Sequence, residues 1–355
     1  MQSHVKHPDR DPIRVLIVSD YAYPAGGIEQ FIRQLISALP VHVDCRLLSW
    51  SSDILVPTEF EDLTVVECGD IRQAWPLMDW ASVLFVPTSF NVRMLTRLTT
   101  EYLSRNPKPT VAVVQTSSHS DPSAKSVEIQ NEWLAELLNR CTRVVAVSNE
   151  VAEAIRDLPL MANSTKQIIV IENAARLSTA HLTSPRVEKR KVVSFIGRPF
   201  SQKGFDLYVR LAHDLSQTGL KFVANTVGVP IPKPIKGMTV STTLSDDELL
   251  KFFEQTDVLL VPYLYADGLP LAVLEALNCG VPVIGFDSPG VGHLLRRYAQ
   301  KVIAPNYSQL RRAVEDWHDG RMSLISPSPG AVPSWADALA RYISIIESLG
   351  VPTVE

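Results

Sequence analysis

The feature that most constrains the fold is a regular alternation of short β-branched runs with segments of helical periodicity. The run RVLIVSD at 14–20 leads through a glycine turn into IEQFIRQLISAL at 28–39, where apolar residues recur at helical spacing. The alternation continues as far as QIIVIEN at 167–173. Strands that alternate with helices predict a parallel sheet with helices on both of its faces.

The alternation breaks once and then restarts. Residues 174–191 are polar, charged and aperiodic, which indicates an interdomain linker, and VVSFIGR at 192–198 begins a second series of strands and helices. Two such series in 355 residues predict two doubly wound, Rossmann-like α/β domains that face each other across a cleft. We expect an N-terminal domain at 1–175, a C-terminal domain at 176–330 and a C-terminal helix within 331–355.

Composition and charge exclude several kinds of protein. A net charge of −4 gives no electrostatic case for nucleic acid. The four cysteines are scattered without a CxxC pair, and the eight histidines show no metal-ligand spacing. No apolar run approaches the ~18 residues of a membrane span, and the N-terminus carries no apolar signal region. We therefore expect a soluble, cytoplasmic protein without a metal site and without membrane association.

Two carboxylates flank a predicted helix start in the stretch VPYLYADGLPLAVLEALNCG. Because proline suits a first helical position, we expect the helix to begin at Pro270, which leaves the amides of Leu271 and Ala272 without helical partners. A helix start of this kind binds phosphate. Asp267 would lie within reach of hydroxyls on the ligand, and Glu275 would accept two hydrogen bonds from a ribose diol. Alternatively, Asp267 is a helix-start charge and Glu275 lies on a solvated face.

A second candidate anion site follows the strand expected at 192–198. In FIGRPFSQKGFDL, Gly197 and Arg198 end the strand, and Lys203 precedes the next helix, five residues after the arginine. A guanidinium fork and an ammonium around one strand-to-helix loop suit a diphosphate. The alternative is a pair of exposed surface cations, which is the usual situation of these side chains. This loop and the helix start at Pro270 would lie at the same edge of one predicted sheet.

The first predicted domain offers two further candidates. Gly26 and Gly27 stand between the first strand and the first helix, where a backbone can approach an anion closely; a tight turn without a ligand is the alternative. His119 falls a few residues after the strand at 110–116, at the expected cleft edge, although a lone histidine is more often structural than catalytic. His293 follows glycines and supports no assignment. The sequence contains no G-x-S-x-G pattern and no P-loop.

Taken in order along the chain, these segments resemble the retaining GT-B glycosyltransferases of the large family typified by sucrose-phosphate synthases and bacterial sugar transferases (glycosyltransferase family four type). The resemblance covers most of the chain, and the ordered set is more specific than any one segment. The segments that carry it are AGGIEQFIRQLISAL, TRVVAVSNEVAEAI, IIVIENAA, FIGRPFSQKGFDL, DGLPLAVLEALNCGVPVI and SWADALARYISII. The last is similar to a closing helix that, in such enzymes, crosses back onto the first domain.

The resemblance implies roles for individual positions. Arg198 and Lys203 would neutralise the leaving diphosphate, and Glu275 would hold the ribose. His119 would stand at the sugar, in a loop longer than the family's. Asp267 would hold the donor sugar, although it is one methylene shorter than the family's glutamate. The backbone positions expected to contact the donor are Gly26, Gly27, Gly197, Gly268, Leu269, Pro270, Leu271 and Ala272.

The resemblance also implies an activity, the transfer of a hexose from a UDP- or GDP-linked sugar to a hydroxyl acceptor with retention of configuration. Fixed cations and helix-start amides would stabilise the departing phosphate, whose oxygen would take the acceptor's proton on the same face, so no metal or other cofactor would be needed. A nucleotide-sugar epimerase and a non-catalytic nucleotide-sugar-binding subunit of the same architecture remain as alternatives. The acceptor, a small molecule or a glycan, and the oligomeric state are left open.

Overall fold

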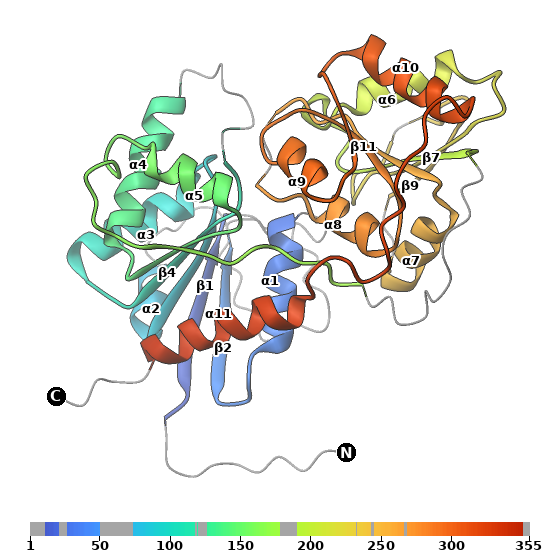
Figure 1. Cartoon of the computed structure of the whole chain (residues 1–355). Helices are drawn as coiled ribbons and strands as arrows, with labels where there is room; N and C mark the ends of the chain where they lie inside the picture. The colour runs from blue at the N-terminus through green and yellow to red at the C-terminus, as the bar shows by residue number, and fades with distance from the viewer. Residues whose placement is uncertain are drawn as a thin grey trace, which may run out of the picture.

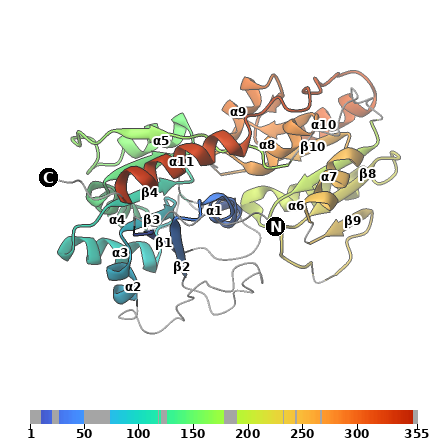
Figure 2. The ribbon, with the colours of Figure 1, turned by 90° about the horizontal axis from the view of Figure 1, so that it is seen from below.

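The structure is a computed structural model that describes residues 11–20, 27–49, 74–117, 119, 126–177, 190–231, 233–242, 245–265 and 268–350. Within these residues the chain forms two α/β lobes, each built on one six-stranded parallel sheet (Figure 1). We call them the N-terminal lobe and the C-terminal lobe. The view from below in Figure 2 shows the same two lobes side by side. The predicted α/β fold of two doubly wound sheets is confirmed.

The N-terminal sheet has the strand order β2-β1-β3-β4-β5-β6. Its strands are β1 (Ile13–Ser19), β2 (Val43–Ser49), β3 (Val83–Thr88), β4 (Thr110–Val114), β5 (Arg143–Ala146) and β6 (Ile168–Val170). The helices between them are α1 (Gly27–Ala38), α2 (Ala74–Trp80), α3 (Met94–Arg105), α4 (Val127–Arg140) and α5 (Asn149–Arg156). The central strands β3 and β4 are buried at every residue, which is why they read as nearly continuous apolar runs.

The C-terminal sheet has the strand order β12-β11-β10-β7-β8-β9. Its strands are β7 (Val192–Ile196), β8 (Lys221–Asn225), β9 (Met238–Ser241), β10 (Val258–Val261), β11 (Val283–Phe286) and β12 (Lys301–Ile303). Its helices are the short 3₁₀ turn η3 (Ser201–Lys203), α6 (Phe205–Asp214), α7 (Asp246–Gln255), α8 (Leu271–Asn278), α9 (Val291–Arg297) and α10 (Tyr307–His318). Because β7 pairs with β10, the loops that follow these two strands leave the sheet beside each other.

The last helix, α11 (Trp335–Gly350), lies across the N-terminal lobe rather than the lobe that precedes it in sequence (Figure 1). The ring of Tyr342 lies 5.1 Å from that of Phe31 on α1, and the Trp335 ring lies 5.9 Å from it. The two segments that connect the lobes run side by side, since Ala175 forms a parallel bridge with Ser334. The chain therefore passes between the lobes twice at one place.

Local sequence signals explain several helix boundaries. The Ser148 hydroxyl accepts a hydrogen bond from the Val151 amide at the start of α5, and Ser245 forms a capping box with Glu248 at the start of α7. The sequence pattern does not reveal α2, η3 and β9, which have three to seven residues and are too short to show a clear periodicity. The run LTVVEC at 63–68, which also predicts a strand, lies outside the described residues.

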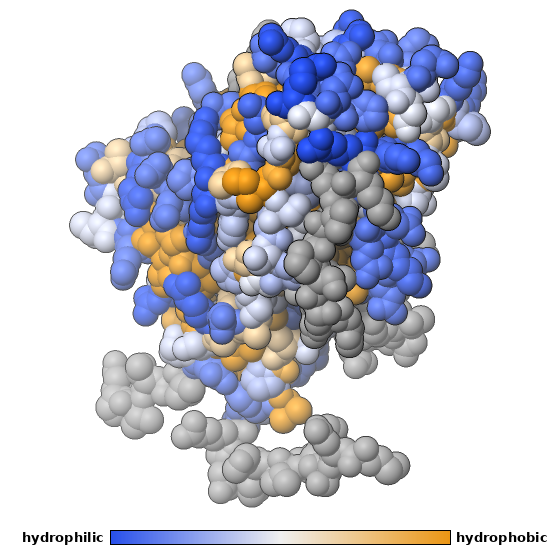
Figure 3. Space-filling view, turned by 45° about the vertical axis from the view of Figure 1, so that its right-hand side comes forward, coloured by the Kyte–Doolittle hydropathy of each residue, from blue (hydrophilic) through white to orange (hydrophobic). Residues whose placement is uncertain are grey.

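The surface and the core differ as expected for a globular protein. The face in Figure 3 is predominantly hydrophilic, with smaller apolar patches between polar residues. Large side chains such as Phe195, Tyr208 and Trp317 are fully buried in the C-terminal lobe. None of the helices in the described ranges combines the length and the apolar character that crossing a bilayer requires.

Candidate active site

Two loops meet at the carboxyl edge of the C-terminal sheet, one after β7 and one after β10. Gly204, which precedes α6, has a φ of +67°, and a Cβ on it would lie 2.1 Å from the carbonyl oxygen of Pro262. Glycine alone tolerates both the left-handed backbone and this close approach. The amide of Leu264 donates to the carbonyl of Gln202 at 2.9 Å. The two loops that carry the predicted anion-binding groups are therefore packed against each other.

Lys203 is held within its own lobe. Its Nζ lies 4.0 Å from the ring centroid of Tyr263, which is a cation–π contact. The Tyr263 hydroxyl donates to the carbonyl of Ile196 at 3.2 Å. The ring that supports the lysine is thus itself tied to the end of β7.

Arg198 reaches across to the other lobe. Its Nη2 lies 3.0 Å from Oε1 of Glu29, in the first turn of α1. The Glu29 side chain is 7% exposed, and burial raises the pKa of its carboxyl while the charge of Arg198 lowers that pKa. The Arg198 side chain is still 32% exposed. The guanidinium therefore has a carboxylate partner and remains accessible to an anion.

Glu29 lies in AGGIEQFIRQLISAL, one of the segments that carry the resemblance, but the sequence alone assigned it no role. An acidic residue in the first turn of a helix is explained by the helix dipole alone, so it attracts no notice. The signal that points to it is its position two residues after Gly27, at a helix start that had already been assigned to an anion.

The segment before α8 lies against the N-terminal lobe. A Cβ on Gly268 would lie 2.0 Å from the carbonyl oxygen of Gln115, so the two backbones are in contact. Nδ2 of Asn173 donates to the carbonyl of Leu269 at 3.3 Å. This segment, which the sequence assigns to the donor sugar, is thus also an interface between the lobes.

Helix α8 begins one residue later than predicted. Pro270 has a ψ of 116° and is the N-cap, and the helix starts at Leu271. The amides of Val273 and Leu274 donate to the Pro270 carbonyl, so the amides of Leu271 and Ala272 precede the first helical hydrogen bond. The predicted pair of helix-start amides is therefore in place at this edge of the sheet.

Glu275 is buried, with 3% of the residue exposed, so the alternative of a solvated face is wrong. Its Oε1 accepts the Arg176 amide at 2.9 Å and its Oε2 accepts the Leu177 amide at 3.1 Å. Burial raises the pKa of the Glu275 carboxyl to about 7, against the lowering effect of these hydrogen bonds. Glu275 therefore ties α8 to the segment that leads out of the N-terminal lobe, and its contact with a ribose stays a prediction.

His119 is 5% exposed and packs inside the N-terminal lobe. Its Nδ1 lies 3.1 Å from Oε1 of Gln130, and its Nε2 lies 2.8 Å from Oδ1 of Asn131, both on α4. The Phe90 ring meets the imidazole edge to face, with centroids 5.8 Å apart. The imidazole is thus fixed by the lobe's own residues, and its contact with a donor sugar stays a prediction.

The predicted glycines differ in what surrounds them. A Cβ on Gly27, the first residue of α1, would meet no atom of the described residues within 4 Å. Gly197 has a φ of +156°, and its amide donates to the carbonyl of Asn225 at 3.0 Å. Gly26 and Asp267, two of the predicted site residues, lie outside the described residues.

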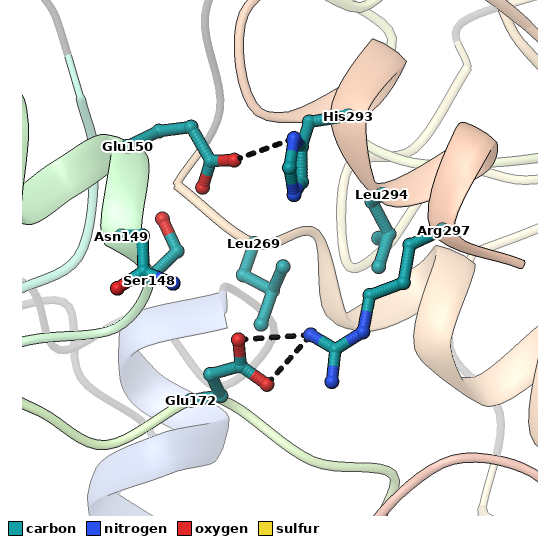
Figure 4. A pocket seen from close by; sticks show the side chains of 8 residues that line it. All are labelled: Ser148, Asn149, Glu150, Glu172, Leu269, His293, Leu294 and Arg297. Atoms are coloured by element: carbon teal, nitrogen blue, oxygen red, sulfur yellow. Dashed lines mark hydrogen bonds and ion pairs between the residues drawn. The ribbon is translucent and has the colours of Figure 1, made fainter.

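A pocket of about 300 Å³ opens between the lobes beside these elements (Figure 4). The N-terminal lobe contributes the start of α5 and the segment after β6, and the C-terminal lobe contributes the segment before α8 and one face of α9. The lining residues are Ser148, Asn149, Glu150, Glu172, Leu269, His293, Leu294 and Arg297. The sequence alone assigns no role to His293.

Two ion pairs cross the pocket from one lobe to the other. Glu150 Oε1 lies 3.2 Å from Nδ1 of His293, and both oxygens of Glu172 lie 2.8 Å from Nη1 of Arg297. The hydrogen bond that Arg297 donates to Glu172 is the main reason that the pKa of Arg297 is raised. Among the described residues, no group of three or more histidine, cysteine, aspartate or glutamate side chains is placed to hold a metal ion.

Sequence comparison connects part of the chain with glycosyltransferases. Residues 232–324 match the family described as "Glycosyl transferases group 1". A phosphatidyl-myo-inositol mannosyltransferase of Propionibacterium freudenreichii subsp. shermanii is 22% identical over 182 residues, which cover 50% of this chain and 46% of that protein. A D-inositol 3-phosphate glycosyltransferase of Rhodococcus jostii is 24% identical over 172 residues, 43% of this chain and 36% of that protein. The chain thus spans less than half the length of these two relatives.

Comparison of folds covers nearly the whole chain. Sucrose-phosphate synthase from Thermosynechococcus elongatus superimposes with a TM-score of 0.72 at 13% identity, over 95% of this chain and 98% of that one. HepE from Anabaena, solved in complex with UDP-glucose, superimposes with a TM-score of 0.68 at 15% identity and the same coverage. At such identities the likeness shows the fold. The chain therefore has the GT-B fold, and its C-terminal lobe contains the segment that matches the group 1 glycosyltransferases.

Proposed function

We propose that the protein is a retaining glycosyltransferase that moves a hexose from a nucleotide-diphosphate sugar to a hydroxyl acceptor. The observation that carries the proposal is the junction of two loops at the carboxyl edge of the C-terminal sheet. One loop supplies Arg198 and Lys203, and the other supplies the start of α8, and Gly204 against Pro262 holds them together. Open parallel sheets bind ligands at this edge.

The chemistry follows from the charges that develop. Cleavage of a sugar–phosphate bond leaves negative charge on the phosphate oxygen and positive charge on the anomeric carbon. Arg198 and Lys203 stabilise the departing diphosphate, and the amides of Leu271 and Ala272 add partial positive charge nearby. Preorganised donors of this kind typically contribute about 10²–10³ in rate each. The departing phosphate oxygen accepts the proton of the acceptor hydroxyl, so that attack occurs on the face from which the diphosphate leaves and configuration is retained.

We infer a UDP-linked donor first and a GDP-linked donor second. Support comes from HepE, which shares the fold and was solved with UDP and with UDP-glucose. Glu275 is the residue that we assign to the ribose, which requires its carboxylate to exchange one of its bonds to the Arg176 or Leu177 amide for a ribose hydroxyl. The two fixed cations supply the charge that a divalent metal supplies elsewhere, and we expect turnover to be independent of one.

The test is a thermal-shift screen against UDP- and GDP-linked hexoses in EDTA, followed by assay of donor consumption. A donor present at 100 times its Kd should raise the free energy of unfolding by about 2.7 kcal/mol. Proton NMR of the first-formed product should show the anomeric configuration of the donor. An inverted product would contradict retention, and failure of every nucleotide sugar to shift the melting temperature would contradict the donor site.

A further inference from the structure

The pocket between the lobes has a chemistry that points to its ligand. We infer that it is the acceptor site and that it selects an uncharged, polyhydroxylated small molecule over a phosphorylated one. This inference rests on the proposed function and specifies its acceptor. It depends on four features of the described lining residues, namely position, size, charge and apolar surface.

The position places a pocket ligand beside the donor loop. The Leu269 side chain faces the pocket from the segment that precedes α8 (Figure 4). Leu269 is two residues from Leu271, whose amide we assign to the donor, a distance of at most about 7 Å along the chain. A ligand in the pocket therefore lies beside the segment that we assign to the donor.

The size limits the ligand. A volume of about 300 Å³ is at the lower end of the range for small-molecule sites. A single sugar or cyclitol ring suits this space better than an extended glycan. Leu269 provides a small apolar surface for the C–H face of such a ring, and most of the other lining groups are polar.

The charge decides between a neutral and an anionic ligand. Two carboxylates, Glu150 and Glu172, face one guanidinium and one imidazole in the described lining. Arg297 contacts both oxygens of Glu172, and the imidazole of His293 lies beside Glu150. With a neutral imidazole, these described lining groups carry one positive and two negative charges, so a phosphate would meet a net negative charge, which is a repulsive arrangement.

Hydroxyl groups, in contrast, match this lining. An ionised carboxylate has about four lone-pair sites, so Glu150 and Glu172 can accept hydroxyl donors while they keep their ion pairs. The amide of Asn149 offers both donors and an acceptor. Because the pairs join the two lobes, the site is complete only when the lobes are in contact, as they are here.

The experiment compares matched acceptor pairs, glucose with glucose 6-phosphate and myo-inositol with its 3-phosphate. Ligand-observed NMR measures binding without turnover, and kcat/KM of transfer is measured with whichever donor the screen identifies. In the wild type, the neutral member of at least one pair should bind and react at least tenfold better than its phosphate. Binding only of the phosphorylated members, or of neither member of either pair, would overturn the inference.

Two variants on α5 distinguish an acceptor site from an ion pair that only holds the lobes together. Glu150→Lys should reduce the neutral-to-phosphate ratio at least tenfold, whereas Glu153→Lys, an exposed position of α5 outside the pocket, should leave it unchanged. Both variants should keep the wild-type melting temperature shift with the donor nucleotide. If Glu150→Lys changes kcat/KM for the neutral and the phosphorylated acceptor by the same factor, the ion pair only holds the lobes together and the inference is wrong. If the donor binds normally and the neutral-to-phosphate ratio does not change, this inference is refuted while the proposed function is not.

Discussion

The two sides of the candidate active site are held in place by different kinds of contact. Gly204 packs on Pro262 and Lys203 lies over Tyr263 at the edge of the C-terminal sheet that we assign to the donor, which we call the donor edge. All four residues belong to the C-terminal lobe. At the pocket, the ion pairs of Glu150 and Glu172 run from one lobe to the other. The loops that carry Gly204 and Lys203 are thus held together by contacts within one lobe, whereas the pocket exists only when both lobes meet.

This difference gives the order of events that we expect. A donor can bind to the C-terminal lobe by itself, and the acceptor pocket forms after the lobes close around the donor. The contact between Arg198 and Glu29 is an exception, since it joins a donor-edge cation to the opposite lobe. Closure and the position of the guanidinium are therefore coupled.

The largest effect should come from the donor-edge cations. Arg198→Ala and Lys203→Ala should each lower kcat by about 10²–10³, because each removes charge stabilisation that develops in the transition state. Arg210→Ala, which removes a cation from the exposed side of α6 where it lies over Tyr307, is the matched control and should keep wild-type kcat. Steady-state kinetics with a saturating donor provide the measurement, and equal kcat in all three variants would contradict the assignment.

Two glycine substitutions test the difference between contacts within the C-terminal lobe and contacts between the lobes. Gly204→Ala introduces left-handed strain and a clash with Pro262 inside one lobe, so it should lower the free energy of unfolding by about 3 kcal/mol or more. Gly268→Ala clashes instead with Gln115 of the other lobe, so it should separate the lobes with a smaller loss of stability. We expect Gly268→Ala to lose transfer and to bind the donor more weakly, because Gly268 is also one of the positions expected to contact the donor. Calorimetry measures the free energy of unfolding of each variant, and titration measures its donor binding. An equal loss of stability in the two variants would contradict the difference between contacts within one lobe and contacts between the lobes.

The pH dependence of stability tests the burial of Glu275. Its pKa is raised in the folded state from 4.5 to about 7, so the folded protein holds a proton that the unfolded chain releases between these pH values. The free energy of unfolding should therefore fall by up to about 3 kcal/mol as the pH rises from 4.5 to 7, and should level off above that. Glu275→Gln should remove this part of the profile. Denaturant titrations of both proteins across this pH range give the comparison, and identical profiles would show that Glu275 is not the group responsible.

The smallest effect should come from the contact that joins the two regions. Glu29→Gln removes the charge that pairs with Arg198 and keeps a hydrogen-bond acceptor, and Arg198 is partly exposed, so transfer should fall only about fivefold, roughly 1 kcal/mol. The loss should appear in kcat rather than in the Kd of the nucleotide, since the lobe that binds the donor is intact. If kcat is unchanged and the nucleotide binds more weakly, Glu29 contributes to donor binding and not to closure of the lobes.

Local patterns predicted most of the fold, because strand and helix periodicity and the caps at Ser148 and Ser245 depend on neighbours in sequence. The adjacency of the Lys203 loop and the α8 start also followed, since parallel strands end at one edge. The contacts of Glu29 and Glu275 did not follow. Each depends on how a residue from one lobe meets a segment far along the chain, and no periodicity records that orientation.

The most direct test of the central claim is calorimetric titration of UDP and of GDP into the protein in EDTA, with the Arg198→Ala/Lys203→Ala double variant in parallel. We predict that at least one nucleotide binds the wild type without a divalent cation and that its Kd is at least tenfold weaker in the double variant, a difference of about 1.4 kcal/mol or more. Equal affinity in the two proteins, or no binding of either nucleotide to the wild type, would contradict a diphosphate site at the carboxyl edge of the C-terminal sheet.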